Sequence, residues 1–170
     1  MRSTRPQVLP PEPDSVWEDE DLARVDWDGA VLERVTFVDC RFDDAQLAEL
    51  VTRRCVFERC VLTGVALAGS SHDGTAFLSC RFDRARLFDV TWDGCKLTGS
   101  HFPGATLRPL TSTDSDWSWT SLRGVDLSGS DLRGATTEAW PWRAVDLTGV
   151  RIDLTQAVQV AVSHGALVEG

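Results

Sequence analysis

The chain has 170 residues, of which 42% are hydrophobic and 25% charged, and its formal net charge is −9. This length suits one domain, and the composition is that of an ordinary soluble protein. The acidic excess argues against a general nucleic-acid binder and is compatible with a basic protein partner, and no apolar stretch approaches the length of about 18 residues that a membrane span needs.

Residues 1–19 show no repeat and are rich in proline, with Pro10, Pro11 and Pro13 close together. We expect a mobile N-terminal tail here. No apolar run follows Arg2 and Arg5, so the segment does not match a signal peptide, and we expect a cytoplasmic protein.

Residues 20–154 are organised by a period of five. From Leu22 onward, 23 of the 27 residues at successive steps of five are large and apolar. The residue two positions before each of them is usually small, and all five cysteines fall in this phase. Neither the period of a helix nor that of a strand produces this pattern. We therefore expect a solenoid in which one large and one small side chain of every five point inward, so that stacked neighbours form the core.

The repeat resembles that of the pentapeptide-repeat family, whose consensus is small–polar–Leu/Phe–polar–Gly. Residues 125–129 (Val-Asp-Leu-Ser-Gly) and 130–134 (Ser-Asp-Leu-Arg-Gly) match it closely. The resemblance implies an all-β fold, a right-handed quadrilateral β-helix in which four pentapeptides form one square coil. Residues 20 apart, such as Leu62 and Phe82, should then lie on adjacent coils about 4.8 Å apart. The cysteines are odd in number and include no CxxC pair, so we expect free buried thiols and neither disulfides nor a zinc site.

Residues 155–170 follow the last repeat and are expected to form a short helical cap. Asp153 and Gln156 have the spacing of a capping box, and Gly165 is placed to end the helix. Because the end of a solenoid exposes apolar side chains and unpaired backbone, this segment should either cover a monomer or join two chains through a two-fold axis. We favour the homodimer and expect its interface to contain Trp142, Leu154, Val158, Val162 and Leu167.

Three stretches narrow the resemblance to the fluoroquinolone-resistance branch of the family, the MfpA and Qnr proteins. They are residues 71–82, residues 107–111 and the tail from Trp142 to Gly165. The resemblance implies a dimeric rod that imitates B-DNA in width and charge, binds DNA gyrase and shields it from quinolones. A DNA mimic needs carboxylates spaced like phosphates. The candidate partner-binding acids are Asp114, Asp116, Asp126, Asp131, Glu138 and Asp146.

These acids also have a simpler interpretation, since the outward positions of any repeat must be solvated. Arg81, Arg84 and Arg86 form a basic patch in the middle of the rod, which dilutes the acidic excess. The alternative function is therefore a protein–protein interaction scaffold with no topoisomerase role.

His72 is the residue that most resembles a catalytic or metal-binding group, because it occupies a position usually held by Leu or Phe. No second histidine lies near it in the stack, and no Ser/His/Asp set, phosphate loop or metal-ligand spacing occurs. We expect its side chain to turn outward in an irregular coil. The chain is thus predicted to be no enzyme and to bind no metal or cofactor.

Overall fold

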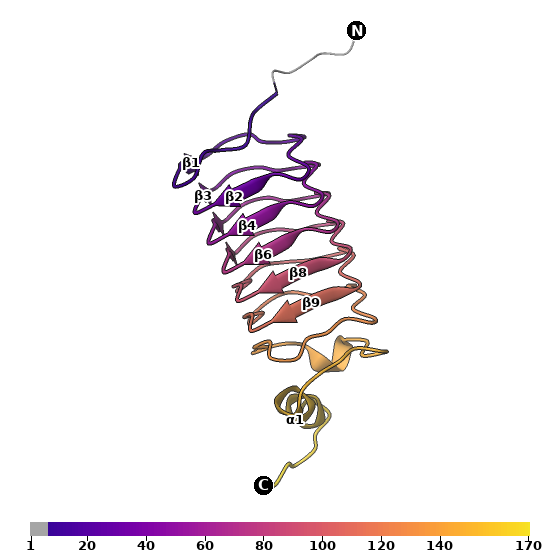
Figure 1. The fold of residues 1–170 in the computed structure, drawn as a ribbon. Helices are drawn as coiled ribbons and strands as arrows, with labels where there is room; N and C mark the ends of the chain where they lie inside the picture. Colours follow the sequence, from indigo (N-terminus) through magenta and orange to yellow (C-terminus); the bar gives the residue numbers. More distant parts are fainter. Residues whose placement is uncertain (1–6) are drawn as a thin grey trace.

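The computed structural model describes residues 7–170, so the first six residues of the expected N-terminal tail lie outside it. The described chain winds into a narrow rod, with the coil of β1 (Val16–Glu18) at one end and the helix α1 (Leu154–Ser163) at the other (Figure 1). All strand pairings are parallel, and each joins residues 20 apart. The expected quadrilateral β-helix is confirmed.

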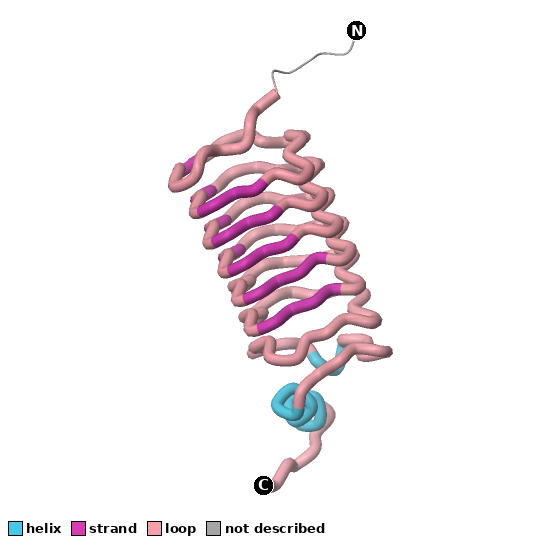
Figure 2. Tube along the Cα trace, viewed as in Figure 1, coloured by secondary structure: helices cyan, strands magenta, loops and turns pink. Residues whose placement is uncertain are grey.

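We number the four sides of the rod as faces 1 to 4, in the order in which the chain follows them from Leu22. Faces 1 and 2 are held by single parallel bridges, such as Asp21 to Arg41 and Asp26 to Gln46. Faces 3 and 4 carry regular strands, and those of face 3 form the stack at the front of Figure 2. Face 3 contains β2 (Val31–Glu33), β4 (Val51–Arg53), β6 (Ser71–Asp73), β8 (Val90–Asp93) and β9 (Leu110–Thr113). Face 4 contains β1 (Val16–Glu18), β3 (Thr36–Val38), β5 (Val56–Glu58) and β7 (Ala76–Leu78).

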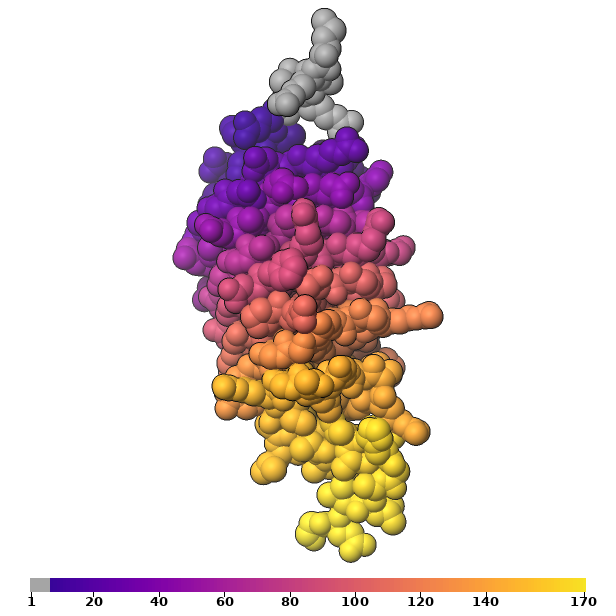
Figure 3. Space-filling view, turned by 90° about the vertical axis from the view of Figure 1, so that its right-hand side faces the viewer, coloured from indigo at the N-terminus to yellow at the C-terminus, as the bar shows by residue number. Residues whose placement is uncertain are grey.

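The core is a column of stacked side chains, one layer to each coil. The backbone N–H of Leu62 donates to the carbonyl oxygen of Arg81 at 2.7 Å, and Leu62 and Phe82 are both buried. The rings of Phe82 and Phe102 lie 4.7 Å apart and nearly parallel, at an angle of 4°. This separation matches the spacing of hydrogen-bonded strands, so the large inner side chains repeat at the same rise as the backbone. The space-filling view shows the coils as successive bands along the rod (Figure 3).

The corners of the coils use left-handed backbone, which explains the glycines of the repeat. Gly64 has φ of +66°, and a Cβ there would clash with the carboxylate of Asp44 on the coil before it. Other corners place Asp, Arg or Glu in the same region, as Arg34 does with φ of +52°. Such residues accept the strain where the outward space permits a side chain.

The solenoid begins earlier than the expected boundary at residue 20. Strand β1 pairs with β3, and Trp17 packs against Trp27 and Phe37. The indole Nε1 of Trp27 donates to the carbonyl oxygen of Val8 at 2.8 Å, so residues before β1 also contact the coil. The early start has a physical reason: Trp17 lies five residues before Leu22, in the inward series of the repeat, and its large apolar side chain is stabilised by packing on the same core.

His72 lies inside the rod, and the expectation that it turns outward is wrong. Its Nδ1 lies 2.7 Å from Thr52 Oγ1, and its Nε2 lies 3.0 Å from Ser70 Oγ. The ring stacks on Trp92 at 4.7 Å, so an imidazole fills the space of a Leu or Phe. Thr75 Oγ1 completes the cluster at 2.8 Å from Thr52 Oγ1. Burial lowers the pKa of His72 to about 3, so the ring is neutral near pH 7.

The last coil departs from the regular path at Pro141. The short 3₁₀ helix η1 (Trp142–Ala144) follows, and α1 then packs against the end of the rod. Asp153 caps α1, since its side chain accepts from the Gln156 N–H at 2.9 Å while the Gln156 side chain accepts from the Asp153 N–H at 3.0 Å. The predicted capping box is confirmed.

Candidate partner-binding surface

The repeat leaves three outward side chains in each pentapeptide, and the 20-residue register sorts them into straight columns. Residues that differ by 20 therefore share a face, as Asp73 and Asp93 do in the pairing of β6 with β8. A binding surface on this rod is built from such columns and from their neighbours on the next coil.

Five carboxylates climb diagonally across faces 3 and 4, one or two to a coil. We call them the acidic staircase. None of the five forms an ion pair within residues 7–170. Its members are Asp73, Asp93, Asp114, Asp116 and Glu138.

The staircase includes three of the six acids proposed from the sequence. Asp114 and Asp116 share one coil, and Glu138 lies on the next. The backbone N–H of Ser118 donates to Asp116 Oδ1 at 2.9 Å, which fixes the direction of that carboxylate. Sequence reasoning missed Asp73 and Asp93, although their separation of 20 residues could have identified them as neighbours.

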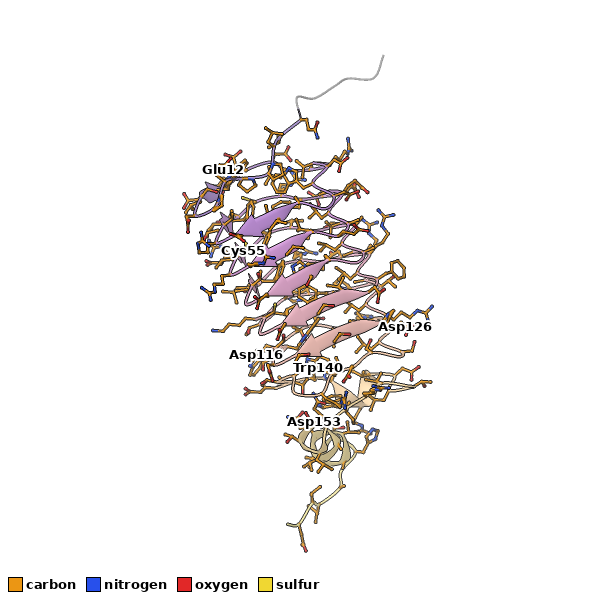
Figure 4. All side chains as sticks on the ribbon, viewed as in Figure 1. Glu12, Cys55, Asp116, Asp126, Trp140 and Asp153 are labelled. Carbon is orange, nitrogen blue, oxygen red and sulfur yellow. The ribbon has the colours of Figure 1, made fainter. Side chains whose placement is uncertain are left out.

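The other three proposed acids lie apart from the staircase or are neutralised. Asp126 and Asp146 belong to face 2, and Figure 4 places Asp116 and Asp126 on opposite sides of the rod. Asp126 pairs with Arg108 at 2.8 Å, and Asp131 on face 3 pairs with Arg133 at 2.7 Å. The hydrogen bonds from Arg133 lower the pKa of Asp131, and those from Ser128 lower the pKa of Asp126. The six acids therefore do not form one continuous patch.

The opposite side of the same coils is basic. Between residues 81 and 143, the pentapeptides of faces 1 and 2 carry six arginines and three aspartates, whereas those of faces 3 and 4 carry five acids and two bases. Asp83 and Asp126 are already paired with Arg81 and Arg108. The rod thus has a transverse separation of charge in this half, which the net charge of the whole chain conceals.

One group of exposed large apolar residues lies at the C-terminal end, on and after α1. Leu154 and Leu167 are 86% and 93% exposed, and Val158 and Val162 are also exposed. Trp142, expected to join them, is instead buried and lies 5.1 Å from the ring of Trp140. It continues the inward series of the repeat, and this burial makes it unavailable to a partner. An exposed apolar face of this kind is typical of an interaction site.

The interior shows how the cysteines are held. All five are free and buried, and Cys80 Sγ donates to the carbonyl oxygen of Phe57 at 3.2 Å. Burial raises the pKa of the Cys40 and Cys95 thiols to about 11. A hydrogen bond with Cys80 lowers the pKa of Cys60, but all five thiols are buried and act as small corner residues.

No group of three or more His, Cys, Asp or Glu side chains that could hold a metal ion occurs in residues 7–170. Within that range, no helix has the length and apolar character needed to cross a bilayer. His72, one of four polar residues at centre positions of the repeat, is 1% exposed and is enclosed by the neighbouring coils. The geometry therefore supports recognition through the outer surface.

Comparisons with known proteins agree with the repeat. A family model described as pentapeptide repeats (8 copies) matches residues 113–136. The pentapeptide repeat protein MfpA of Mycobacterium tuberculosis is 37% identical over 83 residues, which are 46% of this chain and 45% of MfpA. The chain thus spans about half the length of that curated relative. The structure of a trypsin-treated variant of QnrB1, a plasmid-mediated fluoroquinolone resistance protein, superimposes with a TM-score of 0.55 at 16% identity, covering 92% of this chain and 99% of that one. At this identity the likeness concerns the fold.

Proposed function

Because this chain is a pentapeptide-repeat protein, we propose that it acts without catalysis by binding DNA gyrase and protecting that enzyme from quinolone-type inhibitors. The acidic staircase is the surface that meets the enzyme. The proposal is supported by the similarity to MfpA and by the five carboxylates of the acidic staircase, none of which forms an ion pair with an arginine or lysine of residues 7–170.

The staircase suits a protein surface that normally holds DNA. Its carboxylates project from a stack with a rise close to 4.8 Å per coil, and that of Asp116 is held in direction by the Ser118 N–H. The basic surface with which an enzyme binds DNA phosphates attracts such a row of negative charges. This attraction raises the association rate and the specificity of binding between the two proteins. The backbone of Lys96 pairs with that of Asp116 on the next coil of face 4. The positive charge of Lys96 therefore weakens the negative potential of the staircase at that point.

We further propose that two chains pair through the exposed face of α1. Leu154, Val158 and Val162 lie at the end of the rod, where a second copy related by a two-fold axis can cover them. Pairing end to end doubles the length of the rod and brings two staircases into one assembly.

The experiment is a supercoiling and DNA-cleavage assay with purified gyrase, with and without a fluoroquinolone. We expect the protein to inhibit supercoiling at micromolar concentration and to reduce drug-induced cleavage. A folded protein without either effect at that concentration would overturn the gyrase proposal.

The second candidate function is a scaffold for another protein, with no topoisomerase role. The basic side of the rod favours the scaffold function. Arg84, Arg86 and Arg123 form no ion pair within residues 7–170, and their charges would repel the basic DNA-binding surface of an enzyme such as gyrase. Affinity purification under the same salt conditions distinguishes the two, since the scaffold function predicts a partner other than gyrase.

A further inference from the structure

Trp119 is an exposed tryptophan at a corner of the rod where the repeat often has glycine. Its side chain is 61% exposed, whereas the other six tryptophans are buried or half-buried. Its φ is +62°, and among the fifteen described residues other than glycine with a positive φ it is the only aromatic one. Left-handed backbone costs free energy for a residue with a Cβ, and an exposed side chain recovers little of that cost by burial. The stability of the fold alone therefore does not favour tryptophan here.

The neighbouring corners leave the indole accessible. Residues 99 and 139 occupy the same corner on the adjacent coils, and both are small, Gly99 and Ala139. Elsewhere a corner side chain leans on the corner of the next coil, as Arg84 does at Gly104, where its Cγ lies 3.6 Å from the position that a Cβ would take. The same register places the Trp119 indole beside Ala139, and the 61% exposure of the side chain leaves one face of the ring free.

The backbone around Trp119 is held in place. Its N–H donates to the carbonyl oxygen of Glu138 at 2.9 Å, and the Ser118 N–H donates to Asp116 Oδ1 at 2.9 Å. Ser118 is only 4% exposed although its position in the repeat is outward, so neighbouring groups pack closely over this part of face 4. An aromatic side chain on a fixed backbone loses little conformational entropy when a partner covers it.

Carboxylates of the acidic staircase flank the indole. Glu138 directly precedes Ala139 on the next coil, and Asp114 and Asp116 precede Trp119 on its own coil. None of the three forms an ion pair within residues 7–170. A free aromatic face beside such carboxylates favours a cation, because the face of an indole attracts positive charge. Arginine suits this site better than lysine, since a planar guanidinium can stack on the ring while its N–H groups bond to a carboxylate.

We propose that Trp119 and Glu138 bind the side chain of an arginine on the partner protein. The guanidinium stacks on the free face of the indole and donates to the Glu138 carboxylate. The carboxylates of the staircase attract a basic surface, and Trp119 selects an arginine within it. The chemistry of the site is the same whichever protein supplies the arginine, but its assignment to gyrase rests on the function proposed above.

Two synthetic peptides, hexa-arginine and hexa-lysine, test the site without gyrase. The peptides carry the same charge, so the net charge of the staircase attracts both. In calorimetric titrations at about 0.05 M salt, we expect the wild type to bind hexa-arginine about threefold or more tightly than hexa-lysine. Trp119→Gly should lose this preference, and Glu138→Gln should reduce it. Trp119→Phe keeps an aromatic face and should retain part of it.

Ser79→Gly is the matched control. Ser79 lies at the same corner two coils earlier with φ of +52°, so glycine relieves left-handed backbone there without removing an aromatic ring. Both glycine variants should unfold at the urea concentration of the wild type or at a higher one, so unfolding cannot explain a loss of binding. Ser79→Gly should keep the preference for hexa-arginine. If Trp119→Gly kept it too, or if Ser79→Gly lost it equally, the proposal would be overturned.

A titration with gyrase separates this inference from the proposed function. Where the wild type binds gyrase, Trp119→Gly should raise the dissociation constant by about tenfold, and Ser79→Gly should change it by less than about twofold. Equal affinities of the wild type and Trp119→Gly for gyrase would refute the role of Trp119 and leave the gyrase proposal intact. A wild type that does not bind gyrase, but distinguishes the two peptides through Trp119, would refute the gyrase proposal alone.

Discussion

Gln156 joins the C-terminal helix to the rod by donating to the carbonyl oxygen of Leu132 at 2.7 Å. Its side chain is buried, and its Oε1 atom accepts from the Asp153 N–H. One amide therefore completes the capping box and covers two carbonyl groups at the open end of the solenoid.

Replacing Gln156 with Ala should destabilise the protein by about 2–4 kcal/mol, because it leaves the Leu132 and Ala135 carbonyl groups buried and unpaired. Equilibrium urea denaturation followed by circular dichroism measures this change. Gln159→Ala is a partial control, since Gln159 makes a single hydrogen bond with Thr137 and should cost less. Equal losses for the two variants would contradict the role assigned to Gln156.

The acid sensitivity of folding should depend on His72. Its folded-state pKa of about 3 lies below the value of about 6.5 expected in the unfolded chain, so the unfolded state takes up a proton first as the pH falls. Stability should fall by about 1.4 kcal/mol per pH unit between about pH 6 and pH 4 from this residue alone. In His72→Phe this contribution should vanish while the carboxylates still titrate. Identical pH profiles for the two proteins would show that His72 is not held neutral.

The cysteine thiols should be inert in the folded protein. The raised pKa values of Cys40 and Cys95 keep their thiolate forms scarce at about pH 8, whereas a hydrogen bond with Cys80 lowers the pKa of Cys60, so the protection of Cys60 depends on its burial. We expect none of the five to react with a thiol reagent within the time in which the unfolded chain, in guanidinium chloride, reacts at all five. Fast labelling of a native cysteine would indicate an open corner in the stack.

The exposed face of α1 should determine the oligomeric state. Val158→Glu combined with Val162→Glu places two charges on that face, and we expect the chain to become monomeric with unchanged secondary structure. Sedimentation equilibrium measures the change. The matched control places two glutamates on face 3, at the exposed residues Val31 and Thr91, and should leave the dimer intact. A wild-type chain that is already monomeric at high concentration would refute the pairing.

Much of the fold follows from the sequence because the five-residue period constrains nearly every residue. The capping box of Asp153 with Gln156 could be predicted from spacing, and the stacking of Leu62 on Phe82 from the five-residue period together with the four-sided coil that the family resemblance implies. The break at Pro141 could not be found from the period, since Trp142 keeps the correct phase and is indeed buried. The break arises because Pro141 has no N–H to donate to the preceding coil, and the five-residue period does not show which residue lies over which on adjacent coils.

The site was less predictable for a similar reason. His72 is satisfied by hydroxyl groups from its own coil and the one before it, Ser70 and Thr52, so its environment is a property of the stack. The candidate acids were chosen by position along the chain, whereas their function depends on which face they occupy. When the acids are assigned to faces by the rule that residues 20 apart share a face, Asp126 and Asp146 fall on face 2. Asp114, Asp116 and Glu138 fall on faces 3 and 4.

The central claim is that the acidic staircase is the surface that binds gyrase, and the most direct test is the affinity of a staircase variant for the enzyme. In this variant Asp73, Asp93, Asp114 and Asp116 become Asn and Glu138 becomes Gln, changes that keep the size of each side chain. The control makes the equivalent changes on faces 1 and 2, at Asp21, Asp26, Asp28, Asp44 and Glu49. Because both variants lose five negative charges, a difference between them reports position and not net charge.

We predict that the dissociation constant of the staircase variant, measured at about 0.1 M salt, rises by roughly tenfold or more and becomes less dependent on salt, while the control changes by less than about threefold. Wild-type affinity in the staircase variant, or a larger loss in the control, would contradict the claim.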